Sequence, residues 1–154
     1  MEKELNELEK KILNLIQKDF PVSARPFVKI AEKLGGLSEE CVMESLRSLN
    51  ENGYLRRLGP IFNSDRLGYV STLAAIAVSG DEIEKAGEII NSYMEVTHNY
   101  LRSDEKFNMW FTLTAHSGDR LLKIIDEIKE RTGVSEVLNL PVVKKFKIKV
   151  EFNV

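Results

Sequence analysis

Hydrophobic residues recur every three or four positions through the N-terminal third of the chain, which is the spacing of helices with one buried face. The first helix is expected to end near Asp19, because Pro21 disfavours helical backbone in the residue before it. Ser38 is a good N-cap for a third helix, and Gly53 is expected to end that helix. The predicted helices cover residues 5–19, 25–34 and 38–52. Three short helices with tight connections indicate a helix-turn-helix unit.

Two short strands are expected next, at 54–58 and 61–62, where they would form a wing around Gly59-Pro60. From Gly68 onward the hydrophobic pattern changes to the period of two that is typical of strands. Further elements are expected at 70–78, 81–92, 94–102, 107–115, 117–131 and 134–140, with an extra edge strand at 144–152. Their order is the ferredoxin-like βαββαβ arrangement. The sequence therefore predicts an α+β chain with a winged helix-turn-helix domain at 1–62 and a ferredoxin-like domain at 63–154.

The first strand of the predicted ferredoxin-like domain is apolar on both of its faces. Leu73 and Ala75 alternate with Ala74 and Ile76. A sheet that is covered by helices on one side only would leave one of these sets in water. We therefore expect a partner subunit to cover the second face.

Composition limits the classes of function. Of the 154 residues, 43% are hydrophobic and 30% are charged, which is typical of a folded globular protein. The single cysteine, Cys41, excludes an internal disulfide and offers no metal-binding cluster. Residues 1–4 are mostly charged rather than apolar, and the longest apolar runs are too short to cross a membrane. These features predict a cytoplasmic protein with no membrane segment.

The charge of the third predicted helix argues against DNA binding. By its position, this helix would read DNA in a helix-turn-helix protein. It carries one arginine, Arg47, and four glutamates, Glu39, Glu40, Glu44 and Glu51. Contacts with phosphates require cations, so this helix would be repelled by DNA. The predicted wing carries Arg56 and Arg57, which are free to contact DNA or another anion.

The most unusual polar residues lie in the second and third predicted strands of the sheet. His98, Tyr100 and Arg102 alternate along one strand, so they project from the same face. The next strand carries a second row, Asn108, Trp110, Thr112 and Thr114, with His116 just beyond. Whether the two rows share a face depends on the register of the hairpin, which the sequence does not fix. If they do, the sheet has a pocket lined by an imidazole, a phenol, a guanidinium, an amide and an indole.

Two motifs in these strands resemble a known family. They are His98-Asn99-Tyr100-Leu101-Arg102 and Asn108-Met109-Trp110-Phe111-Thr112, supported by segments 20–21, 25–27, 53–59, 67–69, 140–141 and 146–148. The architecture resembles the Lrp/AsnC regulators, and the motifs look like a branch of them, the sirohaem decarboxylases of alternative haem biosynthesis. The pattern is similar to the A-type subunit of that family. This resemblance implies a heterodimer with a related B-type subunit, or a homodimer.

The resemblance also implies a reaction and roles for particular residues. Two acetate carboxylates of sirohaem are removed to give didecarboxysirohaem, with no added cofactor, because the iron is carried by the sirohaem substrate. His98 is the first candidate for the acid that protonates each new methyl group, and Tyr100 is the second. Cationic, amide and aromatic side chains are expected to bind the flat, polyanionic tetrapyrrole: Arg102, Arg56, Arg57, Asn99, Asn108 and Trp110.

Two other functions stay open at this point. An Lrp/AsnC-type DNA-binding transcription regulator that responds to a small ligand would bind DNA with a strong dependence on salt. A tetrapyrrole sensor would bind the same ligand as the enzyme without removing its carboxylates. Product mass after incubation with sirohaem distinguishes the enzyme from both.

Overall fold

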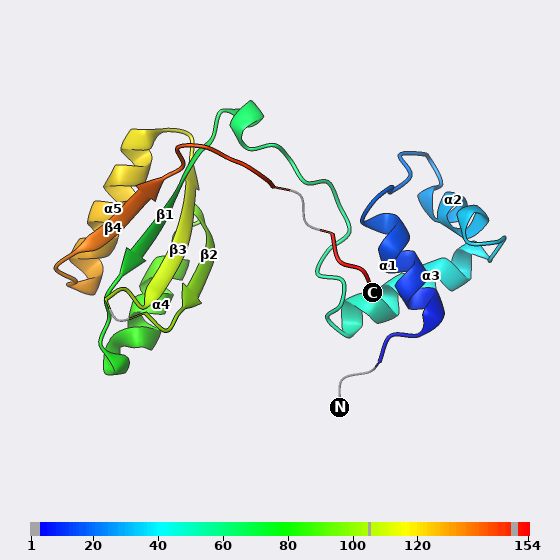
Figure 1. Ribbon diagram of the computed structural model, residues 1–154, viewed down its shortest axis with the longest axis horizontal. Coiled ribbons are helices and arrows are strands. Elements are labelled where there is room, and N and C mark those ends of the chain that lie inside the picture. The colour runs from blue at the N-terminus through cyan, green and yellow to red at the C-terminus, as the bar shows by residue number, and fades with distance from the viewer. Residues whose placement is uncertain (1–3, 105, 149–150) are drawn as a thin grey trace. The chain divides into compact units, whose positions relative to one another are not determined.

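The computed structural model describes residues 4–104, 106–148 and 151–154 (Figure 1). These residues form two compact units. The helical unit contains the described residues up to Pro60 together with those from Lys147 onward, and the sheet unit contains Ile61–Phe146. The two units are described separately below.

The helical unit contains α1 (Glu7–Ile16), α2 (Pro26–Lys33) and α3 (Glu39–Glu51), which confirms the three predicted helices. Asn6 caps α1 reciprocally with Glu9, because each residue's backbone N–H donates to the other's side chain, at 2.9 and 3.0 Å. Ser38 caps α3 by accepting from the N–H of Cys41 at 3.1 Å. The buried side chains of the three helices form one apolar cluster: Ile12, Ile30, Ala31, Val42, Leu46 and Leu49.

The predicted wing is wrong, because residues 54–62 form no strand. Instead, the N–H of Leu55 donates to the carbonyl of Leu49 at 2.9 Å, and the amide of Asn50 donates to the carbonyl of Leu55 at 2.7 Å. These two bonds tie the segment to the end of α3. Pro60 has no N–H to donate, so it cannot complete a hydrogen-bonded hairpin at the predicted turn.

The extra C-terminal strand is also wrong for the described residues, since 142–148 and 151–154 form no strand; residues 149 and 150 lie outside the described residues. The end of the chain belongs to the helical unit. There, the N–H of Phe152 donates to Oε1 of Gln17 at 2.9 Å, and Nε2 of Gln17 donates to the Phe152 carbonyl at 2.6 Å. The side chain of Gln17, the residue that follows α1, therefore satisfies backbone groups that were expected to pair with the sheet.

The sheet unit has the predicted order of six main elements, which confirms the ferredoxin-like domain. They are β1 (Val70–Ile76), α4 (Ile83–Asn91), β2 (Val96–Leu101), β3 (Met109–Ala115), α5 (Gly118–Thr132) and β4 (Val137–Pro141). Short 3-10 helices cover Asp65–Leu67 and Gly80–Glu82. The four strands pair antiparallel in the order β2-β3-β1-β4.

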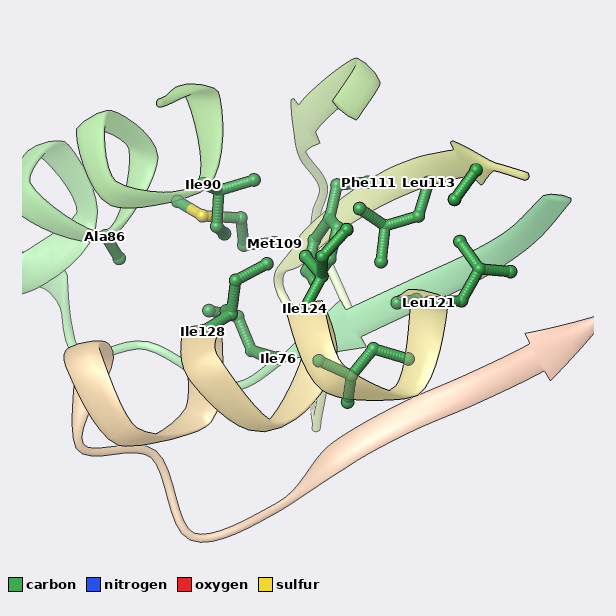
Figure 2. Packing of buried hydrophobic residues seen from close by; sticks show 12 residues of the cluster. Ile76, Ala86, Ile90, Met109, Phe111, Leu113, Leu121, Ile124 and Ile128 are labelled. Carbon is green, nitrogen blue, oxygen red and sulfur yellow. The ribbon is translucent and has the colours of Figure 1, made fainter. Parts of the chain in front are cut away.

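Helices α4 and α5 cover one face of this sheet (Figure 1). On that face, Met109 and Phe111 of β3 pack against Ile90 of α4 and against Ile124 and Ile128 of α5 (Figure 2). These five side chains are at most 3% exposed. Alternate residues of the strands therefore form the core, and the residues between them project from the opposite side of the sheet.

Candidate functional site

The register of the β2–β3 hairpin brings the two polar rows onto the same face. His98 pairs with Thr112, and Tyr100 pairs with Trp110. Residues that lie directly opposite each other on neighbouring strands project to the same side. Because Met109 and Phe111 point into the helix-covered core, both rows lie on the other side of the sheet. We call this side the open face, since α4 and α5 do not cover it.

His98, Tyr100 and Arg102 form an ordered row on the open face. The imidazole and phenol rings are nearly parallel, at an interplanar angle of 24°, with 6.1 Å between their centres. The guanidinium carbon of Arg102 lies 5.4 Å from the centre of the Tyr100 ring, which is a cation–π contact. Nδ1 of His98 lies 3.1 Å from Oγ1 of Thr97, within hydrogen-bond distance. All three side chains of the row are exposed, so a ligand can reach them.

Trp110 supplies a fixed aromatic surface beside this row. Its indole N–H donates to the carbonyl of Phe107 at 2.7 Å, and the side chain is half-buried. The hydrogen bond sets the orientation of the ring, and Tyr100 lies opposite it on β2. A flat apolar group next to a cation and an imidazole is suited to a flat, anionic ligand.

The two asparagines of the predicted site make other contacts. The amide of Asn108 accepts from the N–H of Val78 at 2.9 Å and donates to the Val78 carbonyl at 2.8 Å. Asn99 pairs with Phe111, which places it on the helix-covered side, and its amide donates to Oδ1 of Asn91 at 3.1 Å. The structure therefore does not bring Asn99 together with His98. Substrate binding by Asn99 and Asn108 stays a prediction.

Arg56 and Arg57 are exposed residues of the helical unit, whereas the row of His98, Tyr100 and Arg102 belongs to the sheet unit. Their predicted role in substrate binding stays a prediction. The acidic character of α3 is partly offset within the same unit, because the guanidinium of Arg25 forms an ion pair with Glu39.

The pocket predicted around His98 is not one of the two hollows described below, and the side chains of His98, Tyr100 and Arg102 are exposed. A hollow of about 300 Å³ lies at the end of the sheet, lined by Ala77, Val78, Ser79, Asp104, Lys106 and Asn108. In it, the pKa of Asp104 is lowered, because its carboxylate accepts from the N–H groups of Phe107 and Lys106. A hollow of about 320 Å³ in the helical unit is lined by Phe27, Met43, Leu46, Arg47, Asn50, Leu55 and Leu58. His98, Tyr100 and Arg102 line neither hollow.

The open face has two halves with different side chains, a polar half on β2 and β3 and an apolar half on β1 and β4. The β2–β3 half carries the polar row and Trp110. The β1–β4 half is apolar, because Leu73 pairs with Leu140 and Ala75 pairs with Leu138. Leu73 and Leu140 are 38% and 45% exposed, and because they pair with each other they form one exposed apolar patch. Of the predicted second apolar surface of β1, Leu73 is therefore exposed, whereas Ala75, which pairs with Trp110 and Leu138, is buried.

The same face carries a further pair of rings, Tyr69 and His116, whose contact the sequence did not predict. Tyr69 and His116 lie at the ends of β1 and β3, next to the paired residues Val70 and Ala115. Their ring centres are 4.0 Å apart and their planes are tilted by 32°. In the sequence, the position of His116 is indicated by its spacing, because it continues the pattern of every second residue set by Thr112 and Thr114.

In the described part of the chain, no group of three or more histidine, cysteine, aspartate or glutamate side chains is placed to hold a metal ion. Within the same residues, every helix is too short or too polar to span a membrane.

The fold and the domain content define the class of the protein. Residues 66–147 match the AsnC-like ligand binding domain, and residues 9–56 match the siroheme decarboxylase NirDL-like HTH domain. The AsnC protein of E. coli superposes with a TM-score of 0.81 over 97% of this chain and 99% of that one. At 18% identity, this similarity shows the fold alone. The chain has an AsnC-like ligand-binding domain preceded by a helix-turn-helix domain.

Sequence similarity narrows the class to one family. The siroheme decarboxylase alpha subunit of Desulfovibrio desulfuricans is 40% identical over 149 residues, which are 97% of this chain and 84% of that protein. The crystal structure of the siroheme decarboxylase NirDL in co-complex with an iron-uroporphyrin III analogue superposes with a TM-score of 0.69 at 33% identity. That match covers 94% of this chain and 48% of the NirDL chain. The chain belongs to the sirohaem decarboxylase family.

Proposed function

We propose that this chain is a subunit of a sirohaem decarboxylase, a carbon–carbon lyase that converts sirohaem to didecarboxysirohaem. The observation that carries the proposal is the row of His98, Tyr100 and Arg102 beside Trp110 in a chain of this family. The relative from Desulfovibrio desulfuricans is named as a decarboxylase subunit, and the NirDL structure contains a tetrapyrrole analogue. No resident metal or organic cofactor is part of the proposal, because the iron is carried by the substrate.

Substrate binding follows from the chemistry of the row. Sirohaem is flat and carries several carboxylates, so its site needs an aromatic surface and cations. Trp110 offers the surface, with the ring orientation set by its bond to Phe107. Arg102 offers two parallel N–H donors, which match the two oxygens of a carboxylate. Because Arg102 lies over the Tyr100 ring, its guanidinium is held on the open face.

The chemical step requires one proton for each carboxylate that is lost. The bond between the acetate methylene carbon and its carboxyl carbon breaks, and carbon dioxide leaves. The electron pair of that bond stays on the methylene carbon and is delocalised into the conjugated macrocycle. A proton then adds to this carbon to give a methyl group. We assign this proton to an N–H of His98, with the Tyr100 hydroxyl as the second candidate; solvent returns a proton to the donor afterwards.

A related subunit covers the open face in this proposal. The apolar half around Leu73 and Leu140 supports a protein partner, since exposed apolar patches of this kind mark association surfaces. This chain matches about half of the NirDL chain, and the Desulfovibrio relative is named an alpha subunit, so a second related unit is expected. A B-type subunit in a heterodimer is the first expectation, and a second copy of this chain is the alternative. The predicted cytoplasmic location is retained as part of the proposal.

The deciding experiment is an anaerobic incubation of the purified chain with sirohaem, with and without a B-type subunit, followed by mass spectrometry of the tetrapyrrole. Loss of two carboxyl groups supports the enzyme. Binding of sirohaem without loss of mass would instead support a sensor. Salt-dependent binding to DNA fragments in the absence of tetrapyrrole binding would support a regulator, which the four glutamates of α3 argue against.

A further inference from the structure

The polar half of the open face continues beyond the proposed site, along β3 to His116. Thr112 lies opposite His98, and Thr114 and His116 follow at every second position, so they lie on the same face. The hydroxyl groups of Thr114 and Ser71 are hydrogen-bonded at 2.9 Å. The His116 ring packs against the Tyr69 ring, with 4.0 Å between the ring centres. This side of the sheet therefore ends in a second imidazole, which is exposed and held by an aromatic neighbour.

The position of this second imidazole relative to the first suits a large ligand. The chain contains two histidines, His98 and His116, and both lie on the polar half of the open face. His116 lies four positions after Thr112, the residue opposite His98, which corresponds to about 13 Å at the rise of a strand. The guanidinium of Arg102 lies on the other side of His98, over Tyr100. The proposed proton donor is therefore flanked by a carboxylate-binding group on one side and a free imidazole on the other.

We propose that the Tyr69–His116 pair binds a carboxylate that the substrate retains, at the end of the polar half away from Arg102. An imidazole N–H of His116 donates to the carboxylate, and Tyr69 orients the imidazole through the ring contact. His116 is a substrate-binding residue in this inference and does not supply the proton for the reaction. The inference rests on the proposed function, because it needs a polyanionic ligand broad enough to reach both ends of the polar half.

Two substitutions of His116 separate its N–H from its ring. His116→Gln keeps an N–H donor and loses the ring, whereas His116→Phe keeps a ring to pack on Tyr69 and loses the donor. Affinity is measured by absorbance titration of the assembled protein with iron-uroporphyrin III. We expect His116→Gln to bind within about twofold of the unsubstituted protein and His116→Phe to bind about tenfold more weakly, as for one lost hydrogen bond to a charged group.

The matched control is Arg131→Ala, which removes a cation from the ring of Tyr93 on the helix side of the sheet, where the two groups lie 5.3 Å apart. Its affinity is expected to be unchanged. Normal affinity in His116→Phe overturns the inference, whatever the affinity of His116→Gln. In that case, sirohaem turnover by the unsubstituted protein still supports the proposed function. If the unsubstituted protein neither binds nor converts sirohaem, the proposed function fails and this inference fails with it.

Discussion

Replacement of His98 by alanine tests the assignment of the proton donor. The imidazole is exposed on the open face, and the ring centre of Tyr100 lies 6.1 Å from its own. Removal of a general acid typically lowers a rate by about 10²–10⁴-fold. Because the Tyr100 hydroxyl and water are still able to supply a proton more slowly, we expect His98→Ala to lose about 10²-fold to 10³-fold in turnover rather than all of it.

Substrate affinity separates this role from a binding role. Arg102 and Trp110 remain in His98→Ala, so the Kd for sirohaem is expected to stay within about threefold of the unsubstituted protein. His98→Gln is the matched variant, since it keeps a hydrogen-bond donor but cannot transfer a proton to carbon at a useful rate. Both variants are measured under single turnover with saturating sirohaem, by quantifying substrate, singly decarboxylated intermediate and product. Turnover within about threefold of the unsubstituted protein in His98→Ala would refute the assignment and leave Tyr100 as the candidate, with Tyr100→Phe as its test.

Three further predictions concern the frame of the site. Asn108→Ala should lower the free energy of unfolding by about 1–3 kcal/mol, measured in urea, because both backbone groups of Val78 lose their partner; an unchanged midpoint would contradict this. The pKa of Glu95 is lowered by its hydrogen bond to Arg120, so stability is lost as the pH falls below the ordinary value of 4.5, and Glu95→Gln should flatten that loss in urea titrations at several pH values. Leu140→Glu should weaken association with the partner subunit at least about tenfold in sedimentation experiments, with the chain's own thermal midpoint kept.

Periodicity predicted the elements well where one face of each element is buried. In β3, Met109, Phe111 and Leu113 are buried at every second position, and this alternation is visible in the sequence. The wing and the C-terminal strand also have a strand-like pattern, but a strand needs a neighbour with free backbone groups. At 54–58, the backbone bonds instead to the end of α3, and Phe152 bonds to Gln17. Such partners are distant or irregular, so a local pattern does not reveal them.

The sequence predicts that three site residues share one face of a strand, but it does not predict which residues of the next strand lie beside them. Alternation alone places His98, Tyr100 and Arg102 on one face. Their alignment with Trp110 depends on a shift in the β2–β3 pairing between Val96 and His98, and the sequence carries no clear signal for it. Similarly, Asn99 belongs to the most distinctive motif, yet adjacent residues of a strand point to opposite sides. A motif that is continuous in sequence is therefore divided between the core and the open face.

The apolar half and the polar half of the open face link association of the subunits to the decarboxylation reaction. A charged carboxylate that faces water keeps its hydration, and it loses carbon dioxide more easily once that water is removed. In the single chain, His98 is exposed and Trp110 is half-buried, so water can reach a substrate that binds beside them. The apolar half beside them, with Leu73 and Leu140, is suited to a protein surface. A subunit that packs on those leucines would extend over the neighbouring polar half, so the contact that stabilises the pair also encloses the reacting groups.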